Sequence, residues 1–297
     1  MRPGRLIAVL TVLCLGAPAT ALAGVQSRAI VSASVGVAGV PSHLVLSITR
    51  NGRVAYSRPV NAAGCRQRCS DVAIPPGKSV LHVVDLDRDG EPEVVLGLFT
   101  GGANCCFIDQ VFSFSPGAHT YAKSEHNFLN AGATLATLNG RPVFKSGDAR
   151  ITEAGFTDTA DSGTPIQLWR FARGRFTDVT RSYPALIRAD AAKWMRIFKR
   201  HLSNGVGLIA AWAADEDLLG HSALVRTTLD RLAAQHKLRT PLGLPHNSET
   251  LFVTRLQNCC ASWATPARPA GLSEAAPTLA AYGSGRRSRA APAPLGD

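Results

Sequence analysis

Short apolar runs alternate with turn-forming dipeptides between residues 43 and 179. The stretch HLVLSITRNGRVAYSRPV is typical: two strand-like runs flank an Asn-Gly pair, which accepts positive φ and suits a tight hairpin turn. Comparable turns are expected at Asn51-Gly52, Pro116-Gly117, Asn139-Gly140 and Arg173-Gly174. Because the paired runs are neighbours in the sequence, the pattern predicts an antiparallel β-meander.

The apolar spacing changes after residue 184, where apolar residues recur at intervals of four, three and four. This spacing predicts one apolar helix face, formed by Ile187, Ala191, Trp194 and Phe198. Two more helices are expected over residues 206–219, ended by Gly220, and over residues 222–236, capped by Ser222. The fold class is therefore α+β, with an antiparallel β-meander domain followed by a small α-helical domain.

The two ends of the chain differ from the rest in composition. Residues 1–23 combine basic Arg2 and Arg5, an apolar middle and a small-residue ALA site, as in a signal peptide. We thus expect a β-domain over residues 24–183, a helical domain over 184–257 and a disordered tail over 258–297. An alternative for the tail is an out-of-frame translation, which the other frames of the gene would reveal. The exported protein is expected to be secreted or held at the cell surface.

The formal net charge of +11 is spread along the chain without a basic block. Duplex recognition usually needs a clustered basic stripe, so nucleic acid is not an expected partner. No run after the signal peptide approaches about 18 apolar residues, so stable membrane insertion is not expected either. The expected partner is an unidentified cell-surface or extracellular ligand, and loose attraction to an anionic surface remains an alternative.

Four cysteines of the β-domain favour disulfide bonds, because exported proteins fold in an oxidising environment. They are Cys65, Cys69, Cys105 and Cys106. A zinc site is the alternative, although adjacent cysteines on a strand point to opposite faces and do not easily converge on one ion. The preferred pairing joins the CRQRC loop to the CC pair.

The stretch DLDRDGEPE, residues 85–93, places five carboxylates at alternate positions around Gly90. They belong to Asp85, Asp87, Asp89, Glu91 and Glu93. A loop that coils around an ion turns alternate groups inward, and calcium takes six to eight oxygens at about 2.3–2.6 Å. We expect calcium to be bound by the three aspartates, the Glu93 side chain and the Glu91 carbonyl. The alternative is an acidic hairpin turn without an ion.

This loop resembles the D-x-D-x-D-G-x-x-D/E loop of FG-GAP and VCBS-type repeats, with Glu93 at the ninth place and Arg88 at the fourth. The resemblance implies a calcium-binding strand–loop–strand unit, and the TGGANCC stretch that follows resembles uncharacterised exported actinobacterial proteins. An EF-hand fits less well, since Leu96 stands where its twelfth-position Glu would be. A single acidic loop predicts a propeller-like or sandwich-like domain and not a full propeller.

Strong catalytic signatures are missing: the sequence has no G-x-S-x-G, H-E-x-x-H or Walker motif. Weaker candidates are an acid pair, Asp158 and Asp161, and His82 on the strand entering the acidic loop. The glycines of TGGAN, residues 100–104, would let a ligand approach the backbone, or would form a bulge. The expected function is a calcium-stabilised, non-catalytic structural or binding module. The alternative is a secreted hydrolase acting on polysaccharide or peptide.

Overall fold

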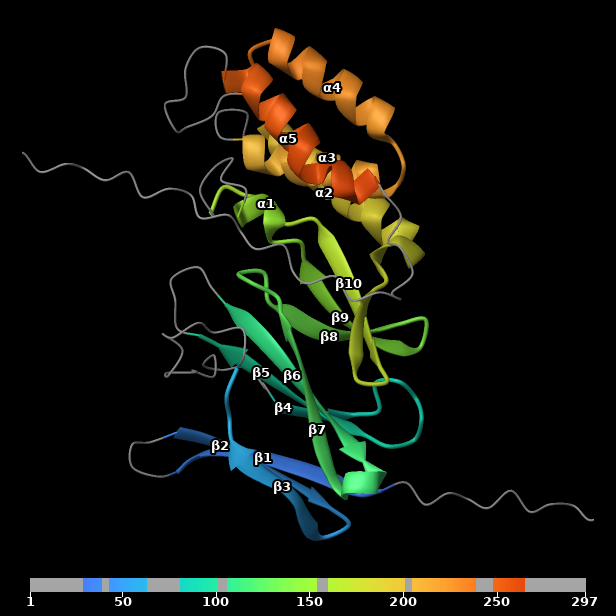
Figure 1. The fold of residues 1–297 in the computed structure, drawn as a ribbon. Helices are drawn as coiled ribbons and strands as arrows, with labels where there is room; N and C mark the ends of the chain where they lie inside the picture. The colour runs from blue at the N-terminus through green and yellow to red at the C-terminus, as the bar shows by residue number, and fades with distance from the viewer. Residues whose placement is uncertain are drawn as a thin grey trace, which may run out of the picture. The chain divides into compact units, whose positions relative to one another are not determined.

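The computed structural model describes residues 29–38, 43–62, 81–100, 106–153, 160–200, 205–238 and 248–264. The fold is α+β, as predicted: three open antiparallel sheets of three or four strands precede the main helices (Figure 1). The described residues belong to one compact unit that ends at Ala264. The expected signal peptide and most of the expected tail lie outside the described residues.

The first sheet has the order β1-β2-β3. Its strands are β1 (Val31–Ala38), β2 (His43–Arg50) and β3 (Arg53–Pro59). Asn51 and Gly52 join β2 to β3 with φ of 50° and 75°, which confirms the predicted Asn-Gly hairpin turn. Strand β1 was not expected from the sequence, and it pairs with β2 over the full length of both strands.

The second sheet is a four-stranded meander with the order β4-β5-β6-β7. It consists of β4 (Leu81–Val84), β5 (Glu93–Phe99), β6 (Phe107–Ser115) and β7 (Thr120–Asn127). A 3₁₀ turn, η1 (Pro116–Ala118), connects β6 to β7 where a bend was predicted. Nearly every residue of β5 is buried, because the sheet has a packed layer on each face.

The third sheet repeats the four-stranded meander in the order β11-β10-β9-β8. It consists of β8 (Ala133–Leu138), β9 (Arg141–Gly147), β10 (Ile166–Ala172) and β11 (Arg175–Asp178). Both predicted hairpin turns are present, at Asn139-Gly140 and Arg173-Gly174, and all four of these residues have positive φ. A short helix that the sequence did not predict, α1 (Arg150–Glu153), follows β9.

Alternate residues of β5 build two separate cores. Val94, Leu96 and Leu98 face the first sheet, where they pack with Leu46 and Ile48 of β2. Val95 faces the third sheet and belongs to a cluster with residues of β6, β9 and β10. The period-two alternation of a strand therefore decides which of the two neighbouring sheets each β5 side chain contacts.

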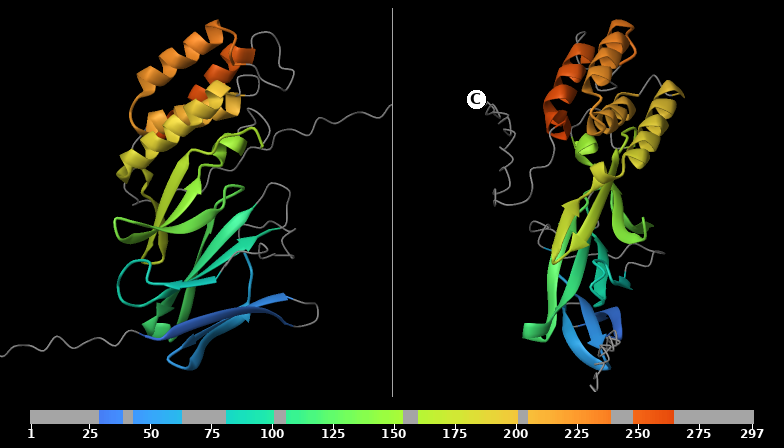
Figure 2. Two further views of the ribbon diagram at one scale, coloured as in Figure 1. Left: turned by 180° about the vertical axis from the view of Figure 1, so that it is seen from behind. Right: turned by 90° about the vertical axis from the view of Figure 1, so that its right-hand side faces the viewer.

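Four helices follow the third sheet and pack together (Figure 2). They are α2 (Pro184–Arg200), α3 (Val206–Leu218), α4 (Ser222–Ala234) and α5 (Ser248–Ala264). The predicted apolar face of α2 is confirmed for Ile187, Ala191 and Phe198, which are buried, while Trp194 is partly buried. Helix α3 contacts the other three, and it is buried over most of its length.

Two helix ends differ from the sequence prediction. Helix α4 begins at Ser222, but His221 occupies the N-cap position without a side-chain capping bond. The predicted cap at Ser222 is therefore wrong. Helix α5 continues to Ala264, beyond residue 257 where the helical part was expected to end. In the described part of the chain, every helix is too short or too polar to cross a bilayer.

Candidate metal centre

The acidic loop connects β4 to β5 and is held between two fixed points. The last registered pair of these strands is Val84 with Glu93, so residues 85–92 form the connection. Leu86, only 3% exposed, packs into the core between the second and third sheets beside Phe144 and Phe171. This apolar anchor fixes the polar loop against the core.

Three of the predicted ligands converge. One carboxylate oxygen from each of Asp85, Asp87 and Asp89 lies within 4.8 Å of the other two. Oxygens bound to one calcium ion at about 2.4 Å cannot be more than about 5 Å apart, so this spacing fits a shared ion. Arg88 and Gly90 have φ of 66° and 93°, and these two left-handed residues produce the tight coil that brings the aspartates together.

The same aspartates also accept hydrogen bonds from the backbone of the loop. The amide of Gly90 donates to Asp85 Oδ2 at 3.1 Å, and the amide of Glu91 donates to Asp89 Oδ1 at 2.8 Å. A longer bond of 3.3 Å runs from the Asp89 amide to Asp87 Oδ1. These bonds fix the loop geometry whether or not an ion is bound, which is the structural role expected of an acidic turn.

Backbone donors leave part of the negative charge unbalanced. Asp85 Oδ1 is buried and has no hydrogen-bond donor among the described residues. Glu93 is 3% exposed and accepts one bond, 2.9 Å from the Leu86 amide to its Oε2. Burial, and to a smaller extent the charges of the three aspartates, raise the pKa of Glu93 to about 7 against the opposing effect of the Leu86 hydrogen bond. A cation among these oxygens would offset both effects.

Glu91 lies apart from the other carboxylates. Its side chain pairs with Arg50 of β2, with 3.0 Å from Nε to Oε1 and 2.7 Å from Nη2 to Oε2. Only its backbone carbonyl therefore remains for the ligand role that the sequence suggested. The partner residue was not foreseen, because 41 positions separate the two residues and no local pattern links them.

The third sheet also contacts the loop. The amide of Arg173, in the β10–β11 turn, donates to Asp87 Oδ2 at 3.3 Å, and the two segments lie side by side in Figure 1. Nη2 of Arg88 reaches Gly140 in the β8–β9 turn, 3.1 Å from where a Cβ at that glycine would lie. The candidate centre thus lies where elements of all three sheets meet.

Comparisons with known proteins give limited information. No family model and no solved structure matches the chain. One relative is described as a probable thylakoid lumen protein of Synechocystis sp.. The two are 28% identical over 151 residues, which is 48% of this chain and 44% of the relative. The match thus spans less than half of the relative's length, and its printed description names no ligand or activity.

The other candidate residues are only partly placed. Cys106 is disulfide-bonded, but Cys65, Cys69 and Cys105 lie outside the described residues, so the preferred pairing stays a prediction. The glycines of TGGAN and Asp158 lie outside them as well. His82 lines a cavity, and Asp161 is not among the described residues that line it. Asp161 and His82 are thus not brought together at this cavity, and the acid pair as a whole stays a prediction.

Among the described groups, the acidic loop has the clearest chemical capability. Asp85, Asp87 and Asp89 form a cluster that can hold a metal ion through carboxylate oxygens alone. Oxygen ligands favour hard cations over the soft ions that thiolates or imidazoles select. The arrangement suits ion binding, with Glu93 and the Glu91 carbonyl near enough in sequence to complete the shell.

Proposed function

We propose that the chain is an exported, calcium-binding, non-catalytic module. The observation that carries this proposal is the convergence of three aspartate carboxylates, of which Asp85 Oδ1 is buried and has no hydrogen-bond donor among the described residues. A buried carboxylate oxygen without a partner is costly, so a bound cation gives this geometry a physical purpose. The resemblance of the loop to FG-GAP and VCBS repeats supports the same conclusion.

Calcium suits the site better than magnesium or zinc. The flexible loop offers carboxylate and carbonyl oxygens in an irregular set, which calcium accepts with six to eight ligands. Magnesium demands a stricter octahedron and retains its waters, and zinc prefers nitrogen or sulfur ligands that the described loop lacks. An organic ligand for the module as a whole is a separate question.

The proposed role of calcium is structural. Through Arg50 and Glu91 the loop is tied to the first sheet, and through Asp87 and Arg173 to the third. An ion that neutralises the loop would fix the β4–β5 register and strengthen both contacts. Because the unfolded chain lacks this arrangement, binding would stabilise the native state by about 2.7 kcal/mol at 100 times Kd.

We place the protein outside the cytoplasm. The predicted signal peptide over residues 1–23 and the cysteine usage both support export. The relative from Synechocystis sp. carries the description of a lumen protein, which fits an exported or lumenal location. A secreted or cell-surface location for this chain belongs to the same proposal.

The test is calcium titration of the purified mature protein by calorimetry, together with thermal unfolding in EDTA and in millimolar calcium. We expect saturable uptake and a higher melting temperature with calcium. In the variant Asp89→Asn, one oxygen remains to accept the Glu91 amide, but the charge is removed. This variant should bind calcium at least about tenfold more weakly.

The two conditions separate an ion site from a simple acidic turn. In EDTA, Asp89→Asn should unfold no earlier than the parent, because it relieves repulsion among the aspartates and keeps the one acceptor oxygen that the loop uses. In calcium it should unfold earlier than the parent. The matched control is Asp230→Asn, an exposed aspartate on α4, which should change neither result. Equal melting of the parent in EDTA and calcium would remove the proposal.

A further inference from the structure

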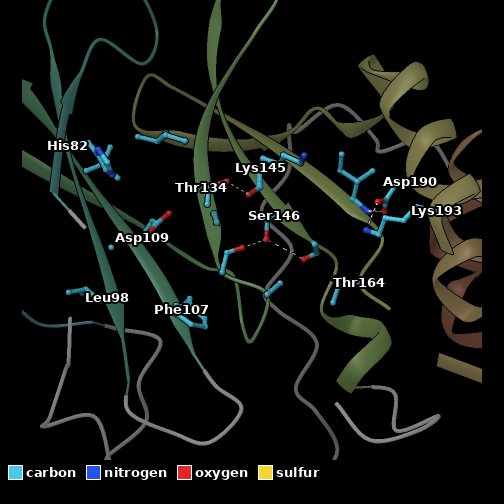
Figure 3. Close-up of a pocket in the computed structure, with 18 residues that line it drawn as sticks. His82, Leu98, Phe107, Asp109, Thr134, Lys145, Ser146, Thr164, Asp190 and Lys193 are labelled. Atoms are coloured by element: carbon cyan, nitrogen blue, oxygen red, sulfur yellow. Dashed lines mark hydrogen bonds and ion pairs between the residues drawn. The ribbon is translucent and has the colours of Figure 1, made fainter. Parts of the chain in front are cut away.

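A cavity of about 760 Å³ lies between the second and third sheets (Figure 3). Strands β4, β5 and β6 form one wall, strands β8 and β9 the other, and α2 contributes at one end. Its volume lies within the range of about 300–1,000 Å³ that small-molecule sites occupy. Its apolar lining residues include Val95, Phe107, Leu135 and Ile166.

Asp109 of β6 brings a carboxyl group to this cavity. It pairs with Gly97 of β5 in the strand register, so no neighbouring side chain covers it from that strand. The structure gives its carboxyl no hydrogen bond or ion pair with any described residue. Burial raises the pKa of Asp109 to about 7, which shows that its charged form lacks a stabilising partner.

The second carboxylate at the cavity already has partners at both of its oxygens. Asp190 of α2 accepts bonds from the Ile166 amide at 2.9 Å and from the Trp194 indole at 2.8 Å, both at Oδ2. Its Oδ1 forms an ion pair with Lys193 Nζ at 2.9 Å, so the ammonium group of Lys193 already has a partner as well. Among the described lining residues, Asp109 is therefore the carboxyl group with unused bonding capacity.

The hydroxyl group of Ser146 adds an acceptor to the wall. Ser146 of β9 donates its hydroxyl proton to the Gly132 carbonyl at 2.5 Å, so its oxygen faces the cavity as an acceptor. Lys145 also lines the cavity, but as a residue it is exposed, so its ammonium group is hydrated. The cavity thus presents an anionic acceptor, a neutral acceptor, the imidazole of His82 and apolar walls.

We propose that this cavity binds a small organic cation, a primary or secondary amine with an apolar body, with Asp109 as the counter-ion. The protonated amine supplies the donors that Asp109 and Ser146 lack, and its hydrocarbon part covers the apolar wall. An anion would be repelled by the Asp109 carboxylate. A neutral alcohol would leave that charge uncompensated. This site is separate from the acidic loop and does not depend on calcium.

The test compares amines with matched alcohols. The parent protein is titrated with benzylamine, cyclohexylamine, benzyl alcohol and cyclohexanol at about pH 8, where both Asp109 and the amines are charged. Binding is followed by calorimetry and by the rise in melting temperature. We expect saturable binding of at least one amine, at least about tenfold tighter than the alcohol of the same body.

The variant Asp109→Asn keeps the size of the side chain and removes its charge. It should fold, since an amide avoids the cost of a buried unpaired carboxylate, and its melting curve without ligand confirms this. It should lose at least about tenfold of amine affinity, with alcohol affinity unchanged. The control Asp230→Asn makes the same change at an exposed site and should bind like the parent.

Three results would each overturn the proposal. They are no saturable binding of either amine at millimolar concentration, equal affinity for an amine and its alcohol, and unchanged amine affinity in the folded Asp109→Asn variant. Calcium titration of the same variant should match the parent. A failure at the cavity is therefore distinguishable from a failure at the acidic loop.

Discussion

Arg50 of β2 holds Glu91 of the acidic loop through two hydrogen bonds, one of 3.0 Å to Oε1 and one of 2.7 Å to Oε2. The guanidinium also lies 4.0 Å from the centre of the Phe114 ring. The hydrogen bond and the charge of Glu91 raise the pKa of Arg50 against the effect of burial. One cation thus joins the first sheet to the loop between β4 and β5.

We predict that Arg50→Gln lowers the free energy of unfolding by about 1 kcal/mol, because the pair is bidentate but about a quarter exposed. Chemical denaturation measures the change. Calcium affinity should fall less than threefold, since the Glu91 side chain lies outside the proposed ligand set. The control Arg53→Gln, at an exposed position of β3, should stay within about 0.5 kcal/mol. A loss of calcium binding in Arg50→Gln would contradict this division of roles.

Asp215 of α3 is completely buried and lies beside Asp190. When both carboxyl groups are charged, neither oxygen of Asp215 has a hydrogen-bond donor among the described residues. Burial raises the pKa of Asp215 to about 9, and the neighbouring charge of Asp190 adds to the shift. Asp215 is therefore protonated at neutral pH and can donate a hydrogen bond to Asp190.

This pair predicts the direction of a pH dependence. The unfolded carboxyl has a pKa of about 4 and the folded one is raised, so the folded state binds the proton more tightly. Its contribution to stability is fully present below about pH 4 and is lost as pH rises through about 9. Asp215→Asn should flatten this part of the curve and stabilise the protein near neutral pH by about 2–4 kcal/mol.

Denaturation across a pH series tests the Asp215 prediction. The control Asp230→Asn changes an exposed aspartate and should leave the shape of the curve unchanged. A parent and an Asp215→Asn variant with the same slope between about pH 5 and pH 8 would show that Asp215 does not retain its proton.

Asp190 connects the start of β10 to α2, because its Oδ2 accepts both the Ile166 amide and the Trp194 indole. We predict that Asp190→Ala destabilises the protein by about 2–4 kcal/mol, since both donors and Lys193 lose their acceptor. Urea unfolding gives the value, and Asp230→Ala on α4 is the control. A cost below about 0.5 kcal/mol would mean that water replaces these bonds without penalty.

Phe144 of β9 is 1% exposed and packs between the second and third sheets against Phe176, with ring centres 5.1 Å apart. Phe144→Ala should cost about 3–5 kcal/mol through the cavity that it leaves. Because the described strands and helices belong to one compact unit, we expect helix loss, followed by circular dichroism, to shift to lower temperature as well. Helices that melt at the parent temperature would argue for independent parts. Val54→Ala, at a position 68% exposed, is the control.

Local patterns predicted the elements well where the signal was strong. The Asn51-Gly52, Asn139-Gly140 and Arg173-Gly174 turns were predictable because positive φ is a property of a few residues. Strand β1 was missed because the stretch VSASVGVA is small and weakly apolar, and its pairing with β2 supplies the order that its own residues do not. The position of helix α3 was predictable from the sequence. Its burial was not, because that depends on packing against α2, α4 and α5.

For the acidic loop, the sequence by itself determined the alternation of carboxylates and the glycine that allows the coil, because both are properties of spacing. Only the tertiary structure decided that Glu91 turns to Arg50, that Leu86 anchors the loop and that Arg173 reaches Asp87. It also placed Asp109 in a cavity, with its carboxyl unpaired among the described residues, and Asp215 beside Asp190. These relationships join residues far apart in the chain. Their energies depend on desolvation, which the local sequence pattern does not determine.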